Sequence, residues 1–374
     1  TDAAMSDVDF HEIEAPTPTY EDAAEQYAEF EAAFGAAQNG DACVAVIRRW
    51  DEYLRRLGTW QALVHLRFNQ DTTNEAYKQA RDYCDELAPK LTELDVRMKR
   101  RILSCAYRDA ISEALGDTAL SLWQAHVTTY DPAIEDDMVA ELKLEAEYIE
   151  LTASAKIPLR GKTYNISEID KFSQEPDREL RHEARKTTWQ WFADNHEVLD
   201  RNFDDLVRLR TRMARTLGFA DFAGLAYKRM CRIDYDREDV DRYRTAVRDH
   251  VVPLALELRK LQAAELGLEK LYEWDLSLHD PRGNPKPRGD HDWMLDRAQE
   301  MFDAMGDEIN SIFRMMRDSH LLDLKIREGK GGGGFCTGFP SYGVPFVFAN
   351  FNGTKGDVEV FTHEMGHAFQ GYLS

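Results

Sequence analysis

The sequence has few cysteines and few prolines, and both scarcities narrow the class of protein. Its five cysteines are Cys43, Cys84, Cys105, Cys231 and Cys336, and no two of them form a CxxC pair. Because their number is odd and they lie far apart, we exclude a disulfide framework and expect a reducing compartment. The 12 prolines and the long stretches without glycine favour helices over a β-sandwich or a β-barrel.

Positive charge is also in deficit. The chain carries 47 lysines and arginines against 68 aspartates and glutamates, which gives a formal net charge of -21 at pH 7. Such a surface repels phosphate backbones, so we expect no nucleic-acid partner. We interpret the excess negative charge mainly as a source of solubility. The alternative interpretation is a mild preference for cationic substrates.

Long apolar runs are missing as well. No stretch is long enough to span a membrane, so we expect no membrane partner. The residues from Thr1 to Met5 and the acidic residues after them contain neither the basic nor the apolar region of a signal peptide. Together with the cysteine pattern, this predicts a cytoplasmic protein.

Helical periodicity is abundant. Apolar residues recur at helical spacing from Tyr20 to about Leu144, from Glu179 to about Thr216 and from His291 to about Leu322. In the second region we expect the inner face to consist of Trp189, Phe192, Leu199, Phe203 and Leu206. A further stripe, kinked at Pro253, contains Val240, Tyr243, Val247, Val251, Leu254 and Leu258. These patterns predict a mainly α fold.

A short strand pair interrupts the helical pattern over residues 148–166. Its strands are expected at Tyr148–Thr152 and at Ile157–Gly161 with Tyr164. We therefore expect an N-terminal helical lobe over residues 1–147 and a catalytic lobe over residues 148–374.

The pattern changes again after the glycine-rich run Gly329–Gly334. Strand formers follow, most densely in Val344–Phe351, and Asn352-Gly353 is a turn signal. Thr354 and Asp357 match a capping box that opens a helix. The order strand, loop, strand, turn, helix is therefore expected here.

This last helix carries the residues best suited to chemistry. His363 and His367 are four positions apart, so they lie on one helix face and can both bind one zinc ion. Glu364 follows the first histidine, where its carboxylate can act as general base on a metal-activated water. Gln370 and Leu373 occupy the positions where a metzincin needs glycine and histidine, so that subclass is excluded. Two solvated histidines on an ordinary helix are the plain alternative.

The run from Gly333 to Phe369 resembles the oligoendopeptidase F family of zinc metallopeptidases, which is kin to thimet oligopeptidase. The residues that carry this resemblance are Gly333-Gly-Phe-Cys-Thr, Pro340-Ser-Tyr, Pro345-Phe-Val-Phe-Ala-Asn-Phe-Asn-Gly-Thr, Gly356-Asp-Val and Thr362-His-Glu-Met-Gly-His-Ala-Phe. The resemblance implies a mainly α, two-lobed fold with a small β-sheet beside the HExxH helix and a deep substrate channel. It implies cleavage of short, unfolded oligopeptides, with His363 and His367 as zinc ligands and Glu364 as base.

The resemblance also implies a third zinc ligand, a glutamate on a later helix beyond residue 374. After His367 only Ala-Phe-Gln-Gly-Tyr-Leu-Ser remains, without a carboxylate, histidine or cysteine. We therefore expect a complementary C-terminal chain or segment. The alternatives are a catalytically incomplete fragment that binds peptides without cutting them, and a metal-dependent enzyme of another class.

Other residues near this region have weaker assignments. An exposed edge strand at residues 344–351 or 332–337 is a candidate for pairing with an extended peptide. Cys336 is interpreted as a buried small residue rather than a nucleophile. His279, His291 and His320 are interpreted as ordinary surface or partly buried histidines.

Overall fold

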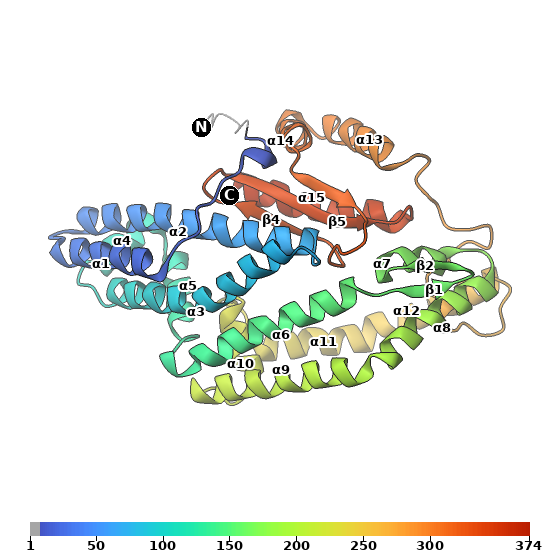
Figure 1. Cartoon of the computed structure of the whole chain (residues 1–374), viewed down its shortest axis with the longest axis horizontal. Coiled ribbons are helices and arrows are strands. Elements are labelled where there is room, and N and C mark those ends of the chain that lie inside the picture. The colour runs from blue at the N-terminus through green and yellow to red at the C-terminus, as the bar shows by residue number, and fades with distance from the viewer. Residues whose placement is uncertain (1–7) are drawn as a thin grey trace.

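Helices dominate the N-terminal part of the chain. The computed structural model describes residues 8–374 (Figure 1). After the short 3-10 helix Phe10–Glu12, five α-helices follow: α1 (Tyr20–Ala36), α2 (Gly40–Gln70), α3 (Glu75–Leu103), α4 (Arg108–Leu115) and α5 (Asp117–Val127). Asn39 and Asn74 start α2 and α3 because their side chains accept hydrogen bonds from the first free backbone N–H groups. Tyr27, Trp50 and Met98 are fully enclosed between these helices.

The middle of the chain is a set of long helices around one small hairpin. Its elements are α6 (Glu135–Ala153), β1 (Ile157–Leu159), β2 (Lys162–Tyr164), α7 (Ile166–Ile169), α8 (Arg178–Asp194), α9 (His196–Thr216) and α10 (Phe222–Arg229), with 3-10 helices at Pro132–Ile134 and Asp170–Gln174. The hairpin confirms the strands expected around Ile157 and Tyr164. The strand expected at Tyr148–Thr152 is wrong, because α6 continues through it. The proposed division at residue 147 lies within α6 and stays a prediction.

The inner face predicted for α8 and α9 is only partly correct. Phe192, Leu199 and Leu206 are half-buried, whereas the other two residues predicted for this face are exposed. Trp189 is 56% exposed and Phe203 is 69% exposed. The face of α9 that packs against α6 carries Asn202, which donates to the Leu144 carbonyl at 2.9 Å, and the buried Leu209. Polar contacts to α6 therefore help to fix the orientation of α9 about its own axis. The spacing of apolar residues gave no indication of these contacts.

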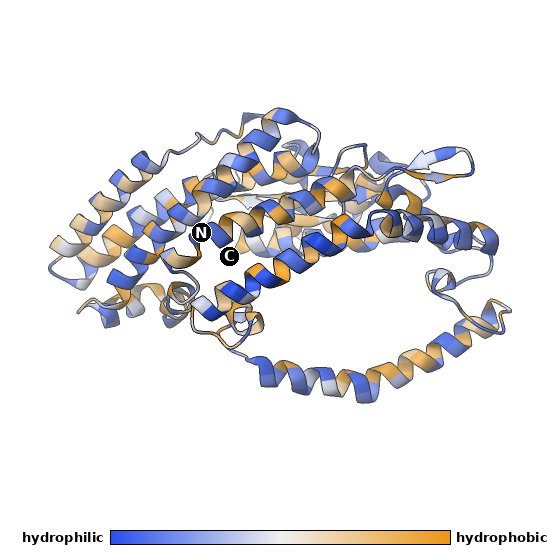
Figure 2. Ribbon diagram, turned by 60° about the horizontal axis from the view of Figure 1, so that its bottom comes forward, coloured by the Kyte–Doolittle hydropathy of each residue, from blue (hydrophilic) through white to orange (hydrophobic). Residues whose placement is uncertain are grey.

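The helix around Pro253 stands apart from its neighbours. α11 (Arg237–Ala246) passes through one π-helical turn (Val247–Val251) into α12 (Val252–Glu265). The predicted irregularity at Pro253 is present, because proline supplies no N–H to the helix and the π turn precedes it. The expected buried stripe is absent: Tyr243, Leu254 and Leu258 are 55–70% exposed. Figure 2 shows this segment as an arch that is mostly hydrophilic along α11 and richer in apolar residues along α12.

A three-stranded sheet and its helices form the C-terminal part. The 3-10 helix Glu273–Asp275 is followed by α13 (His291–Asp303), α14 (Asp307–Asp318), β3 (Leu322–Lys325), β4 (Phe335–Phe339), β5 (Val344–Phe351) and α15 (Lys355–Leu373). The helix expected from His291 to Leu322 is two helices, because Gly306 takes a left-handed conformation at φ 130° between them. The strand order is β3-β5-β4. The central strand β5 pairs in parallel with β3 and antiparallel with β4.

The sheet is the base on which α15 lies (Figure 1). Seven of the eight β5 residues are buried, which is typical of a strand covered on both faces. Phe361 and Met365 of α15 and Phe313 of α14 share one core with β5. The mainly α class with a small sheet beside the histidine helix is therefore confirmed. Within residues 8–374, no helix is both long and apolar enough to cross a membrane.

Candidate metal centre and adjoining cleft

The imidazoles of His363 and His367 face each other on the exposed side of α15. Their Nε2 atoms are 3.2 Å apart and their ring centroids are 4.9 Å apart. Two nitrogens bound tetrahedrally to one zinc ion at its usual bond length lie about 3.3 Å apart. The donor set and its spacing therefore fit zinc without a change in the helix.

The opposite side of α15 holds the two histidines in place. Phe361, Met365, Ala368 and Phe369 are buried against the sheet and the neighbouring helices. Because these positions recur every three to four residues, they fix the rotation of the helix about its axis. The rotation leaves both imidazoles on the accessible face.

Glu364 lies between the buried and the exposed faces. Its residue is 8% exposed, and its carboxylate is close enough to Cys336 on β4 to affect that thiol. Burial raises the pKa of Cys336 to about 11, and the negative charge of Glu364 adds to the effect. A thiol with this pKa stays protonated at neutral pH and is a poor nucleophile, as predicted for Cys336, although the residue is half-buried rather than buried.

The turn before α15 differs from the predicted capping box. The Thr354 hydroxyl donates to the Asn352 side-chain carbonyl at 2.8 Å and caps no helical N–H. Asp357 instead accepts from the backbone N–H groups of Asn352 at 2.9 Å and Gly353 at 2.7 Å. The helix begins where it was predicted, but a buried carboxylate inside it organises the turn.

The edge of the sheet next to the histidine helix is β4. β5 is the central strand, so the alternative that residues 344–351 form an exposed edge is wrong. β4 pairs with β5 on one side, and within residues 8–374 no strand pairs with its other side. Phe335–Phe339, at the end of the predicted 332–337 stretch, is thus an edge strand, as is β3 on the other side of the sheet.

A cleft of about 820 Å³ runs beside the start of α15. One wall is made by α7, α8 and residues 273–279, and the other by the glycines before β4 and the α15 residues Gly356, Glu359 and Val360. Gly356, Val360, His363 and His367 follow the i, i+4, i+7, i+11 spacing of one helix face. The cleft therefore borders the same face of α15 that carries the two histidines farther along the helix.

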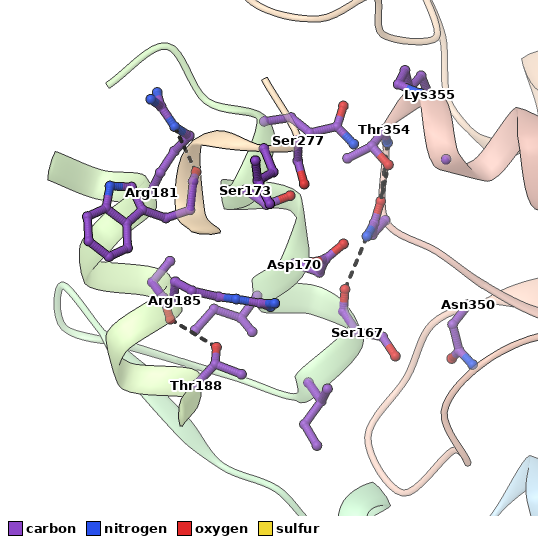
Figure 3. A pocket seen from close by; sticks show the side chains of 18 of the residues that line it. Ser167, Asp170, Ser173, Arg181, Arg185, Thr188, Ser277, Asn350, Thr354 and Lys355 are labelled. Carbon is purple, nitrogen blue, oxygen red and sulfur yellow. Dashed lines mark hydrogen bonds between the residues drawn. The ribbon is translucent and has the colours of Figure 1, made fainter. Parts of the chain in front are cut away.

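One carboxylate in this cleft has no partner among the described residues. Asp170 points into the space between α8 and the start of α15 (Figure 3), and no hydrogen bond or ion pair to it is present within residues 8–374. The nearby Arg185 directs its guanidinium to Glu273, with one bond of 2.7 Å. Asp170 is exposed to solvent within the cleft, yet the surrounding walls partly desolvate its carboxylate and raise its pKa, and the charge of Arg185 partly opposes this. Lys355, on the opposite wall, is paired with Glu359.

The predicted site residues are thus brought together on one helix, except for the third ligand. Within residues 8–374, no third histidine, cysteine or carboxylate forms a cluster with His363 and His367. Sequence reasoning missed Asp170, which lies in a short 3-10 helix far from the motif and carries no local signal. His279 is exposed, as predicted for a surface histidine, and lines the cleft.

Comparisons with known proteins cover nearly the whole chain. The profile of Peptidase family M3 matches residues 172–374, and that of the Peptidase M3 N-terminal domain matches residues 10–130. No curated protein matched the sequence. Nothing in these comparisons supports a separate chain that completes the site.

Two of the matching solved structures share the fold over 98% of this chain. A protein assigned as oligoendopeptidase F from Bacillus anthracis is 37% identical with a TM-score of 0.96, over 98% of this chain and 68% of that one. A PZ peptidase A solved with an inhibitor is 35% identical with a TM-score of 0.96, over 98% of this chain and 65% of that one. An oligoendopeptidase-F from Enterococcus faecium shares only the fold, at 16% identity and a TM-score of 0.51, over 81% of this chain and 64% of that one. The chain spans about two thirds of the length of these structures.

Proposed function

The chain belongs to peptidase family M3, and from this membership and the geometry of α15 we propose that it is a zinc-dependent endopeptidase of short, unfolded oligopeptides. The membership agrees with the resemblance to oligoendopeptidase F found in the sequence. The observation that carries the proposal is the pair of Nε2 atoms, 3.2 Å apart beside Glu364. Imidazole donors favour zinc over magnesium or calcium, which prefer oxygen ligands.

Each residue of the motif has a distinct role in the proposed reaction. His363 and His367 hold the metal through Nε2. A bound zinc ion supplies Lewis acidity, which polarises the peptide carbonyl and lowers the pKa of a coordinated water. Glu364 takes a proton from the attacking water and passes it to the leaving amine. The resemblance assigns the third ligand to a glutamate outside residues 1–374.

The substrate is proposed to lie extended along the open edge of β4 and the cleft. Backbone hydrogen bonds to a strand edge recognise any extended peptide and read few side chains. From Gly356 to His367 the helix rises about 16 Å, which matches roughly five residues of an extended peptide. This length favours oligopeptides over folded proteins.

A reducing compartment is proposed for the protein. All five cysteines are free in the structure, and reduced thiols are typical of the cytoplasm.

Zinc analysis tests the metal assignment directly. We expect His363→Ala and His367→Ala each to retain one zinc ion fewer per chain than the wild type after dialysis. Glu364→Gln is the matched control and should keep its zinc, because Glu364 is assigned as base and not as ligand. Equal zinc content in all four proteins would overturn the assignment.

A peptide-binding module without hydrolysis is the second candidate. It is favoured by one observation: within residues 8–374 only two ligands face the metal position. Peptide affinity without turnover in zinc-loaded protein would support it over the peptidase.

A further inference from the structure

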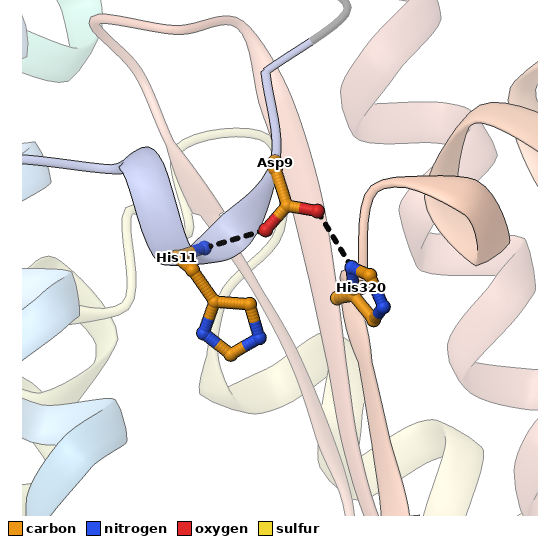
Figure 4. A group of neighbouring side chains, drawn as sticks. All are labelled: Asp9, His11 and His320. Atoms are coloured by element: carbon orange, nitrogen blue, oxygen red, sulfur yellow. Dashed lines mark hydrogen bonds and ion pairs between the residues drawn. The ribbon is translucent and has the colours of Figure 1, made fainter.

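A second cluster of metal-ligating side chains lies outside the cleft. Asp9 and His11 lie near the N-terminus, His320 lies in the turn between α14 and β3, and the three side chains meet beside the sheet (Figure 4). Asp9 Oδ2 accepts from His320 Nδ1 at 2.6 Å, and Asp9 Oδ1 accepts from the His11 backbone N–H at 2.9 Å. The two imidazole centroids are 5.4 Å apart. One ligand atom from each residue lies within 4.8 Å of the other two.

His320 occupies a backbone conformation that its residue type rarely adopts. Its φ is 56°, in the left-handed region, at the turn that ends α14. Leu321 N–H donates across this turn to the Met316 carbonyl at 2.9 Å, as in the usual glycine-ended helix terminus. Glycine takes this position without strain, whereas histidine does not. Residues held in this region cluster at active sites, ligand clamps and switch regions.

The segment that carries the other two residues is docked rather than loose. The Phe10 N–H donates to the Ser319 carbonyl at 2.8 Å, and the Phe10 ring lies 4.8 Å from that of Phe346 on β5. These contacts join residues 8–13 to the turn between α14 and β3. The three side chains are therefore positioned by packed elements, while their polar ends remain accessible to solvent.

We propose that Asp9, His11 and His320 bind a divalent metal ion such as zinc. Two imidazoles and one carboxylate are a donor set for such ions, and the exposed side leaves positions for water. On binding, the metal replaces the proton that His320 Nδ1 shares with Asp9, and this proton passes to solvent. The ion then links the N-terminal segment to the sheet under α15. This site is independent of the proposed peptidase function.

The test uses the full chain with His363→Ala and His367→Ala, so that zinc at the candidate catalytic centre does not contribute. Zinc bound per chain is measured after dialysis, and the melting temperature Tm is measured in zinc and in chelator. The informative variant is His320→Gly, because glycine suits the left-handed backbone and the variant should fold. His11→Ala removes a ligand without touching that turn.

We expect the parent chain to bind one zinc ion and both variants to bind none. At free zinc ten times its dissociation constant, Tm of the parent should rise by about 2 °C, whereas neither variant should respond. In chelator, His320→Gly should be at least as stable as its parent. Magnesium should shift none of the proteins.

Two results would overturn the site. One is a parent chain that retains no zinc. The other is an equal zinc content or an equal zinc-induced Tm shift in the parent and in both variants. If the variants only lower Tm, by the same amount in zinc and in chelator, the cluster is an ordinary polar contact and the proposal is wrong.

Discussion

At the scale of single residues, the buried ammonium of Lys330 fixes the glycine-rich run before β4. Its side chain is 0% exposed. Nζ donates to Asp323 Oδ1 at 2.9 Å and to the carbonyls of Ala349 at 2.6 Å and Lys325 at 3.0 Å. A cation ringed by such acceptors ties the loop to β3 and β5. The glycine-rich run is therefore anchored to the sheet at Lys330.

Replacing Lys330 by methionine should destabilise the fold by about 3 kcal/mol. The variant leaves buried carbonyls and part of the Asp323 carboxylate without a donor. The measurement is the free energy of unfolding by chemical denaturation. Lys325→Met is the matched control, since that side chain is 66% exposed, and we expect it to stay within about 0.5 kcal/mol of the wild type. Equal stabilities for the two variants would contradict the anchor.

Asp170 should raise kcat/KM for peptides that place a positively charged group in the cleft. Its carboxylate has no partner within residues 8–374, so a lysine or arginine side chain or a free amino terminus can supply one. We expect Asp170→Asn to lower kcat/KM about tenfold for peptides with such a group several residues from the cleaved bond, a change of about 1.4 kcal/mol. Neutral peptides of the same length should change less than about twofold.

Three peptides separate the two sources of positive charge: one with an internal lysine, one with only a free amino terminus, and one with neither. Asp109→Asn removes the same charge on α4, outside the cleft lining. It should leave the ratio of cationic to neutral kcat/KM unchanged. If Asp170→Asn also leaves this ratio unchanged, Asp170 has no role in specificity.

At the scale of elements, local sequence patterns predicted the strands and helix that carry the candidate metal centre better than the elements around them. The sequence predicted β4, β5 and the start of α15, because turn residues and strand formers over 329–354 act through near neighbours. It missed β3, which has four residues and pairs in parallel with β5 across a long connection. It also placed the exposed Phe203 on the inner face of α9 and missed the polar contact that Asn202 makes there with α6.

The exposed leucines of α12 should matter little for stability. Leu254, Leu256 and Leu258 are each more than half exposed, so their removal exposes little new apolar surface in the chain itself. We expect Leu256→Gln to change the free energy of unfolding by less than about 0.5 kcal/mol. Leu225→Ala is the comparison, because Leu225 is fully buried, and it should cost about 2–5 kcal/mol. A large effect at Leu256 in denaturation experiments would show that α12 packs against a surface in solution.

At the scale of the whole molecule, the candidate site combines a local motif with distant parts of the chain. His363, Glu364 and His367 lie within one helix, and their chemistry follows from residue types and spacing alone. The opposite wall of the cleft comes from α7, α8 and residues 273–279, and only the folded chain brings it beside α15. The Asp9, His11 and His320 cluster depends on tertiary contact in the same way.

Cleavage of an internally quenched peptide of about ten residues tests the central claim most directly. The wild type, Glu364→Gln and Glu308→Gln, an exposed glutamate on α14, are compared before and after a chelator, and again after zinc is returned. The account predicts that the chelator abolishes cleavage, that zinc restores it, and that Glu364→Gln loses about 10²–10⁴-fold in rate while Glu308→Gln is unaffected. Cleavage that persists in chelator, full activity of Glu364→Gln, or a zinc-loaded wild type that binds the peptide without cutting it would contradict the account.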